Sequence, residues 1–255
     1  MAKMIFLGTA YVLAYDGHEN TFLVIQGDQS SILVDCAAKP IQRLKEAGVS
    51  FNELSDLIIT HFHPDHVSGL PNLLMDMWLM GREKEFHIHG CEHAISRAQK
   101  MMELFDLQEW TGMYPLHFHT VPLEELTPVI NSPEFRILTS PVEHMIPTLG
   151  LRIEYQGDRF ILAYSSDTKP VPQTARLAAD ADVLIHEATG SVYHHSTASQ
   201  AGEIAQKANA KSLYLVHYGF YDDITPESML SDAKTTFTGK VVLAEDLMEI
   251  EFKKD

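Results

Sequence analysis

Three histidines and an aspartate gather within six residues of this chain, in the run His61-Phe62-His63-Pro64-Asp65-His66. The run follows an apolar segment, residues 57–60, that is typical of a buried strand. Imidazole nitrogens and carboxylate oxygens are the ligands that a borderline divalent ion such as Zn²⁺ takes in proteins. In a loop at a strand end, His61 and His63 can point to one side while Asp65 and His66 point to another. The run therefore predicts ligands for two metal ions, in a loop that Pro64 stiffens.

The same run resembles the His-x-His-x-Asp-His motif of the metallo-β-lactamase superfamily, and the later parts of that pattern follow in order. His144 matches the third histidine of the first metal, Asp167 the aspartate that bridges both metals, and His217 the histidine that completes the second metal. The resemblance extends from residue 5 to about residue 245. It implies an α/β fold with mixed sheets, a four-layer αβ/βα sandwich that carries a dinuclear metal site at one edge.

This resemblance implies two ions that each have three ligands and share one aspartate. The implied ligands are His61, His63 and His144 for the first ion, Asp65, His66 and His217 for the second, and Asp167 for both. A water shared by two cations about 3.5–4 Å apart loses its proton near neutral pH and becomes a nucleophile. Asp65 would lie close enough to accept that proton. The expected cofactor is two Zn²⁺ ions, with Mn²⁺ as the alternative.

Two further segments resemble the RNase Z-like branch of the superfamily. Residues 185–189, Ile-His-Glu-Ala-Thr, match its His-Glu-Ala-Thr segment, and residues 195–197 match its His-Ser-Thr motif. The branch implies that His195 binds a phosphoryl oxygen and protonates the leaving oxygen, while Glu187 orients His195 as in other acid–base pairs. Thr197 is interpreted separately, as the N-cap of the helix that follows.

Several features depart from the RNase Z enzymes that trim tRNA. Those enzymes carry a long tRNA-gripping arm between the third metal histidine and the bridging aspartate, but His144 and Asp167 are only 23 positions apart. The residues after His217, Tyr-Gly-Phe-Tyr, lack the arginine that could face phosphate, and the usual Asp-Cys-Gly turn is Asp-Cys-Ala-Ala at residues 35–38. The formal net charge of −16 also disfavours long nucleic acid, because Lys and Arg supply most of the affinity for a polyphosphate.

We therefore expect a dizinc phosphodiesterase that hydrolyses a small phosphodiester, most readily a 3′,5′-cyclic nucleotide, by attack of a metal-bridging hydroxide. Compact RNase Z-like enzymes that hydrolyse cyclic nucleotides, including phage-encoded ones that disable cyclic-pyrimidine defence signalling, resemble this layout. The alternatives are an RNase Z-type tRNA 3′-end endonuclease, another hydrolase such as a lactonase or thioesterase, and a non-catalytic binding protein. His195 and Glu187 disfavour carboxyl-ester chemistry, the seven ligands disfavour a binding protein, and His63 disfavours the diiron relatives, which carry Glu there.

The elements that must position these residues alternate along the chain. Hydrophobic periodicity predicts strands over residues 4–7, 21–25, 31–35, 56–60, 85–89, 116–121, 135–140, 149–155, 160–165, 182–186, 212–217 and 240–244. It predicts helices over residues 41–47, 70–80, 92–105, 171–178, 199–208 and 226–237. Both halves open with paired strands and continue into strand–helix alternation, which indicates two mixed sheets with helices outside. Since no linker separates the halves, we expect one domain over residues 1–255.

Composition limits the setting. Hydrophobic residues make up 45% of the chain and charged residues 21%, as in folded globular proteins. Two cysteines are too few for a disulfide framework, so a cytoplasmic location is expected. The apolar run near the N-terminus is too short for a signal peptide, and no stretch of 18 apolar residues predicts a membrane span.

Two other features allow more than one interpretation. The helix predicted over residues 70–80 is apolar on nearly every side, so it is either buried or part of a homodimer interface centred on Met75, Met77, Trp78 and Met80. His87 with His89, and His117 with His119, alternate along two strands, so each pair shares a face. They are ordinary polar residues, an accessory metal site, or (for the second pair) part of a substrate mouth beside the aromatic segment 110–115, where a ring could stack on a base.

Overall fold

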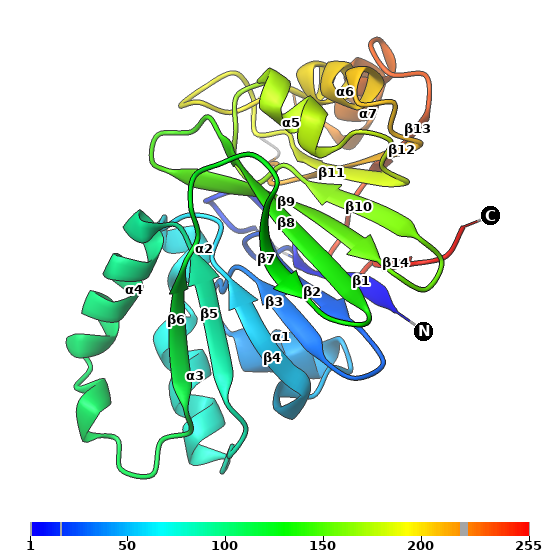
Figure 1. Cartoon of the computed structure of the whole chain (residues 1–255). Coiled ribbons are helices and arrows are strands. Elements are labelled where there is room, and N and C mark those ends of the chain that lie inside the picture. The colour runs from blue at the N-terminus through cyan, green and yellow to red at the C-terminus, as the bar shows by residue number, and fades with distance from the viewer. Residues whose placement is uncertain (1, 16, 220–223, 255) are drawn as a thin grey trace.

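Two sheets lie face to face in the computed structural model, which describes residues 2–15, 17–219 and 224–254 (Figure 1). Residues 220 and 221, at the end of the late motif, lie outside the described residues. The first sheet has the order β14-β1-β2-β3-β4-β5-β6. Its strands are β1 (Lys3–Gly8), β2 (Phe22–Gln26), β3 (Ser31–Val34), β4 (Leu54–Ile58), β5 (Phe86–Gly90), β6 (Leu116–Thr120) and β14 (Glu249–Glu251).

The second sheet has the order β13-β12-β11-β10-β9-β8-β7. Its strands are β7 (Thr127–Asn131), β8 (Phe135–Val142), β9 (Thr148–Tyr155), β10 (Phe160–Tyr164), β11 (Val183–Glu187), β12 (Ser212–Val216) and β13 (Lys240–Leu243). Each sheet joins an antiparallel part to a parallel part, because β3 to β6 and β10 to β13 pair in parallel. The two halves of the chain thus repeat one pattern, as their sequences predict.

Helices form the two outer layers (Figure 1). On the first sheet they are α1 (Pro40–Glu46), α2 (Pro64–Val67), α3 (Leu70–Leu79) and α4 (Glu92–Glu103), and on the second α5 (Pro172–Leu177), α6 (Ala198–Lys207) and α7 (Pro226–Lys234). Short 3₁₀ turns, η1 (Phe51–Glu53) and η2 (Leu107–Glu109), precede β4 and follow α4. Within the described ranges, no helix combines the length and apolar character needed to cross a bilayer.

The period-two alternation of the strands divides the apolar residues among the layers. In β1, Ile5 and Leu7 pack toward the helices of the first sheet, whereas Met4 and Phe6 pack between the two sheets. A third cluster joins the second sheet to its helices through residues such as Ile204. Side chains of a strand point alternately to opposite faces, so strands buried on both faces need apolar residues at nearly every position. The result is the four-layer sandwich predicted from the sequence.

The predicted strands and helices are all present, with ends shifted by a few residues. Two strands, β7 and β14, were not predicted. β7 contains Pro128, which favours an edge position because proline cannot donate to a strand ladder, and β14 has only three residues. The helix α3 is partly buried, since Leu73, Leu74 and Met77 lie in the core while the outer side of the helix is exposed.

Candidate metal centre

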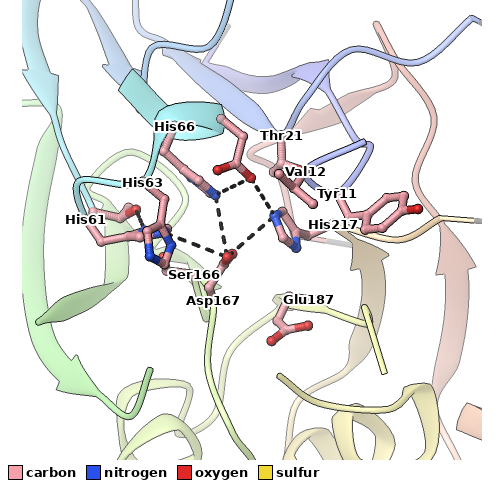
Figure 2. Close-up of polar contacts among 12 residues, drawn as sticks. Tyr11, Val12, Thr21, His61, His63, His66, Ser166, Asp167, Glu187 and His217 are labelled. Carbon is pink, nitrogen blue, oxygen red and sulfur yellow. Dashed lines mark hydrogen bonds and ion pairs between the residues drawn. The ribbon is translucent and has the colours of Figure 1, made fainter. Parts of the chain in front are cut away.

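The carboxyl ends of parallel strands from both sheets meet at one edge of the sandwich, and the candidate ligands lie there (Figure 2). His61 follows β4, Asp167 follows β10 and His217 follows β12, while Glu187 is the last residue of β11. Parallel strands in a sheet end on the same side, which brings residues far apart in sequence together. His144 reaches the same edge from the loop after β8.

The backbone turns sharply as it leaves these strands. Asp35, Ser166 and His217 adopt left-handed conformations, with φ of 61°, 53° and 50°. Such conformations cost on the order of 1–3 kcal/mol in a residue other than glycine, and they cluster at sites that the surrounding structure holds rigidly. Each of the three residues lies within two positions after the end of a strand. His217 is a candidate ligand, Ser166 precedes the candidate ligand Asp167, and Asp35 accepts a hydrogen bond from the candidate ligand His66.

A close backbone approach fixes the short helix α2 against the turn after β3. The Cys36 N–H donates to the His66 carbonyl at 2.7 Å, and the Gly69 N–H donates to the Cys36 carbonyl at 2.9 Å. A Cβ atom on Gly69 would lie 2.0 Å from the Ala37 carbonyl oxygen. Only glycine fits there without a shift of the backbone, so Gly69 determines how closely His66 approaches the end of β3.

Three overlapping groups of side chains can each hold a metal ion, with donor atoms within 4.8 Å of one another. They are His61, His63, His144 and Asp167; Asp65, His66 and His217; and Asp167, His195 and His217. The first two groups coincide with the two ligand sets that the resemblance implies, and the third adds His195, for which no ligand role was predicted.

Asp167 stands at the centre of the site (Figure 2). Its Oδ2 atom lies 3.7 Å from His61 Nε2 and 3.9 Å from His144 Nε2. The same oxygen lies 3.5 Å from His66 Nε2 and 3.4 Å from His217 Nε2. One carboxylate oxygen therefore faces histidines of both sets, which is the arrangement needed for a shared ligand.

Two buried atoms at this centre support a metal ion rather than a network of hydrogen bonds. His66 Nε2 and Asp167 Oδ1 have no hydrogen-bond partner among the residues that the structure describes. Buried polar atoms are nearly always satisfied, so each unsatisfied atom requires an explanation. A set of imidazole and carboxylate donors that leaves buried atoms free fits divalent ions, for which zinc is the usual occupant.

On the first sheet, the Asp35 carboxylate holds the outer ring nitrogens of two candidate ligands, directly for His66 and through Thr60 for His61. Asp35 accepts hydrogen bonds from the Thr60 N–H and hydroxyl, both at 2.8 Å, and from His66 Nδ1, also at 2.8 Å. Since the Thr60 hydroxyl donates to Asp35, it accepts from His61 Nδ1 at 3.0 Å. Both imidazoles then present an Nε2 lone pair to the centre, as metal-binding histidines with a hydrogen-bonded outer nitrogen do.

The second sheet orients its histidines in the same way. The Thr189 hydroxyl donates to the His217 carbonyl at 2.7 Å and therefore accepts from His217 Nδ1 at 2.8 Å. His144 Nδ1 donates to the His194 carbonyl at 3.3 Å. These supporting contacts, like those of Asp35, were not predicted from the sequence. The signal that the sequence offers is positional, since Asp35, Thr60 and Thr189 are polar residues one or two positions after a buried strand.

When no metal is bound, burial and neighbouring charges shift the pKa values of the site's imidazoles in opposite directions. Burial lowers the pKa of His61 well below its ordinary value and lowers that of His144 to about 4. Burial alone would also lower the pKa of His66, but the negative charges of Asp167 and Asp35 hold it well above its ordinary value. Metal ions compete with protons for such ligands. The site thus attracts positive charge, while burial keeps the His61 and His144 imidazoles neutral and able to bind metal.

Glu187 is fully buried and orders the loop that carries His195. Its Oε1 atom accepts from His195 Nδ1 at 2.8 Å, from the Thr168 N–H at 3.0 Å and from the Ser196 N–H at 3.1 Å. Its Oε2 atom accepts from the Thr189 N–H at 3.0 Å. A carboxylate with four donors is a rigid acceptor, so it fixes the ring plane of His195 and leaves Nε2 for other partners.

The ring of His195 lies among the candidate ligands. Its centroid is 4.8 Å from that of His144 and 5.4 Å from that of His217. Burial lowers the pKa of His195, but the hydrogen bond and charge of Glu187 outweigh burial and raise the pKa above its ordinary value. Thr197 is the N-cap of α6 and forms a capping box with Gln200, as predicted for this position.

A pocket of about 250 Å³ opens over the candidate ligands and has an apolar rim. Val12, Met145 and Tyr193 are among its lining residues, and they expose 57%, 57% and 76% of their surface. The aromatic segment 110–115 and the pair His117 and His119 are not among the residues that line this pocket. The alternative that they line a substrate mouth does not hold for this pocket. Trp110 instead stacks on Trp78 of α3, with ring centroids 5.2 Å apart, as expected for a loop that packs against the fold.

The segment between His144 and Asp167 is too short to include the arm that tRNA-trimming RNase Z enzymes carry at this place. It consists of the antiparallel pair β9 and β10, joined by a short turn at residues 156–159. The spacing seen in the sequence therefore corresponds to a plain hairpin.

Comparisons with known proteins relate the whole chain to one superfamily. The family model described as "Anti-Pycsar protein Apyc1" matches residues 2–241. A ribonuclease Z from Picrophilus torridus is 28% identical, over 99% of this chain and 96% of that protein. The metallo-beta-lactamase fold protein YhfI from Bacillus subtilis superposes with a TM-score of 0.83, at 22% identity and 98% coverage of both chains. Human tRNase Z, short form (ELAC1), superposes with a TM-score of 0.80, at 23% identity, over 99% of this chain and 100% of that chain.

The fold, the cluster of histidines and aspartates, and the relatives together identify a metal-dependent hydrolase of the metallo-β-lactamase fold, in its compact RNase Z-like branch. The family model spans nearly the whole chain and includes every candidate ligand. The chain belongs to the family of the anti-Pycsar protein Apyc1.

Proposed function

We propose that this protein is a phosphodiesterase that uses two divalent metal ions, Zn²⁺ in the first place and Mn²⁺ as the alternative, to hydrolyse a small cyclic nucleotide. The observation that carries the proposal is the pair formed by Glu187 and His195 beside the candidate ligands. A carboxylate that holds an imidazole at a hydrogen-bond distance of 2.8 Å is typical of acid–base catalysis. Cleavage of a nucleotide phosphodiester needs such a group, because its leaving oxygen is a poorly acidic ribose hydroxyl that must gain a proton.

Each side chain has a role in this proposal. When bound, the metal ions would lower the pKa of a water and polarise a phosphoryl oxygen. Asp65, which is partly exposed at the pocket, would accept the proton of that water. His195 would donate a hydrogen bond to a phosphoryl oxygen and deliver a proton to the leaving oxygen, while Glu187 keeps its ring in place.

The pocket favours a small substrate with one base. Its volume of about 250 Å³ is small, and its rim offers apolar side chains rather than a basic track. Tyr193 at this rim has a φ of 47°, and His194 beside it has a φ of 68°. Tyr193 exposes 76% of its surface at this rim, so its ring is accessible and can stack on a nucleobase. We therefore infer that a cyclic nucleotide enters with its phosphate toward the ligands and its base toward Tyr193.

A second candidate function is cleavage of precursor tRNA, and the relatives favour it. Two of them are a ribonuclease Z and a tRNase Z. The RNA-cleaving activities that these names state conflict with our expectation that long nucleic acid is a disfavoured partner. The net charge of −16 and the plain hairpin between β9 and β10 support the smaller substrate.

A direct comparison of substrates tests the proposal. Purified protein with Zn²⁺ would be incubated with 3′,5′-cyclic nucleotides, pyrimidine ones first, and with precursor tRNA, beside an Asp167→Asn control. We expect linear nucleotide from the cyclic substrates, no tRNA cleavage, and no turnover by the control. Rapid tRNA cleavage without turnover of any cyclic nucleotide would overturn the proposal.

We also propose that the protein forms a homodimer through the outer side of α3. Met75 and Met80 are exposed on this helix, as is Leu79, while Trp78 is partly buried against Trp110. Met77 belongs to the core and is removed from the predicted interface.

A further inference from the structure

Four histidines form a second cluster on the first sheet, away from the candidate metal centre. In the parallel pair β5 and β6, His87 is opposite His117 and His89 is opposite His119. Phe86 and Ile88 alternate with the histidines of β5 and pack against the helices. The four imidazoles therefore share the opposite face of the sheet, the face that elsewhere forms the core between the two sheets.

That face changes from apolar to polar as it approaches the edge of the sheet. One row of paired residues runs from Ile32 in β3 through Asp56 in β4 to His87 in β5. Ile32 is buried between the sheets, and it lines an open groove of about 600 Å³ together with the two polar residues. Pro128 and Ile130 of β7, in the second sheet, line the same groove. The sheets thus leave an accessible space where the histidines lie.

Two of these histidines have ring nitrogens within hydrogen-bond distance of each other. His87 Nδ1 and His119 Nε2 are 3.0 Å apart. Imidazole nitrogens bind Zn²⁺ at about 2.0–2.1 Å, and Ni²⁺ and Cu²⁺ also accept imidazole. The 3.0 Å contact is a hydrogen bond, and about 3 Å is also the separation of two such nitrogens that stand about 90° apart around an ion, as in the square-planar geometry of Ni²⁺ and Cu²⁺. The pair has the spacing of adjacent ligands on a single transition-metal ion.

Neighbouring groups hold the two rings in this orientation. His89 Nε2 hydrogen-bonds Asp56 Oδ1 at 2.7 Å, and the His89 ring stacks on that of His119 at a centroid distance of 4.7 Å. Glu85 Oε2 lies 3.4 Å from His117 Nε2, and the His117 ring stacks on that of His87 at 4.9 Å. Each ring of the pair is therefore stacked on an imidazole that a carboxylate anchors or attracts.

We propose that His87 and His119 chelate one transition-metal ion of the class that prefers imidazole, at a site separate from the catalytic centre. To bind the ion, the hydrogen bond between the two nitrogens breaks and the rings turn so that both lone pairs face the metal. The proton on one of these nitrogens moves through solvent to the other nitrogen of the same ring, so both imidazoles remain neutral. β6 is the edge strand of its sheet, and β5 is its one paired strand among the described residues. An ion that joins His87 of β5 to His119 of β6 would therefore clamp the edge strand to the sheet.

Metal counting on the zinc-loaded protein tests the chelate. Protein adjusted to two zinc ions per chain would be dialysed against Ni²⁺, and nickel and zinc per chain would be measured by elemental mass spectrometry. We expect one added nickel in the wild type, none in the double variant His87→Ala and His119→Ala, and one in the matched control His117→Ala, with an unchanged zinc count in all three. The zinc count reports that each variant is folded.

The proposal is overturned if the wild type binds no added nickel, if the double variant binds as much as the wild type, or if His117→Ala loses nickel as fully as the double variant. Hydrogen exchange tests the clamp. Added Ni²⁺ should slow exchange of the β6 amides at least several-fold in the wild type and in His117→Ala, and should leave it unchanged in the double variant. Unchanged exchange in nickel-bound wild type would overturn the clamp.

Discussion

Asp35 shows how a single residue can control a metal site to which it does not contribute a ligand. It is fully buried, and one of its oxygens accepts from both the Thr60 hydroxyl and His66 Nδ1. Burial raises the pKa of this carboxyl, while His66 and Thr60 act in the opposite direction. Burial of this carboxylate therefore costs free energy, and its role is to orient the imidazoles of His66 and, through Thr60, of His61.

Replacement of Asp35 by Asn should weaken metal binding. The amide keeps the shape of the side chain but removes the charge that holds the His66 ring, so metal affinity should fall by about 10–100-fold. Competition with a chromogenic chelator would measure it. Asp56→Asn is the matched control, since Asp56 also supports a histidine but lies in the separate cluster. Equal affinity in the wild type and Asp35→Asn would contradict this role.

The donors of the centre could be predicted from the sequence, but their supporting residues could not. His61 to His66 form a dense local motif, so residue types and spacing alone indicate metal binding. Asp35 supports residues 25 and 31 positions away, and Thr189 supports His217 at a distance of 28 positions. Their roles depend on which strand ends meet in the fold, and this information is not present in the local pattern.

The role of His195 can be separated from a purely structural one by the choice of leaving group. If it protonates the leaving oxygen, His195→Ala should lower kcat/KM on a cyclic nucleotide by about 10²–10⁴-fold. A bis(p-nitrophenyl) phosphodiester has a leaving group that needs no proton, so the loss should be much smaller there. Steady-state kinetics on both substrates would measure the difference. Equal losses on the two substrates would instead indicate a structural role.

At the scale of elements, the parallel strands explain why distant residues form one site. β4, β10 and β12 all end at the edge where His61, Asp167 and His217 lie. These strands were predicted because each is an apolar run. β7 and β14 were missed because a proline and a length of three residues remove the usual pattern. The sequence also did not determine whether α3 is buried or exposed, because a helix that is apolar all round fits either a protein core or a subunit interface.

The outer side of α3 makes a testable prediction about assembly. Leu79 exposes 67% of its surface and Met80 exposes 49%. Exposed apolar side chains that are close together mark interaction surfaces in soluble proteins. The wild type should sediment as a dimer, and the double variant Leu79→Glu and Met80→Glu should sediment as a monomer with unchanged zinc content. A monomeric wild type at micromolar concentration would contradict the proposed interface.

At the scale of the whole molecule, bound metal should contribute to stability. The centre buries Asp35 and Asp167, and the chain already carries a net charge of −16. A ligand that binds only the folded state, at 100 times its Kd, contributes about 2.7 kcal/mol per site. For a chain of this size, that corresponds to a decrease in Tm of roughly 5–10 °C on removal of one ion.

Calorimetry before and after treatment with a chelator would measure this decrease. Readdition of Zn²⁺ should restore the original Tm. The same treatment of Asp167→Asn should change Tm much less, because that variant lacks the shared ligand. A wild-type Tm that does not respond to the chelator would show that the centre does not stabilise the fold.

We propose that seven donors form a two-metal centre that hydrolyses a small cyclic phosphodiester. A titration of metal-free protein with Zn²⁺, in which hydrolysis of a 3′,5′-cyclic nucleotide is followed, tests this proposal. The rate should be absent without metal and should reach its plateau at about two equivalents of zinc per chain, as two ligand sets require. Hydrolysis by metal-free protein, or no hydrolysis at two equivalents, would contradict the claim.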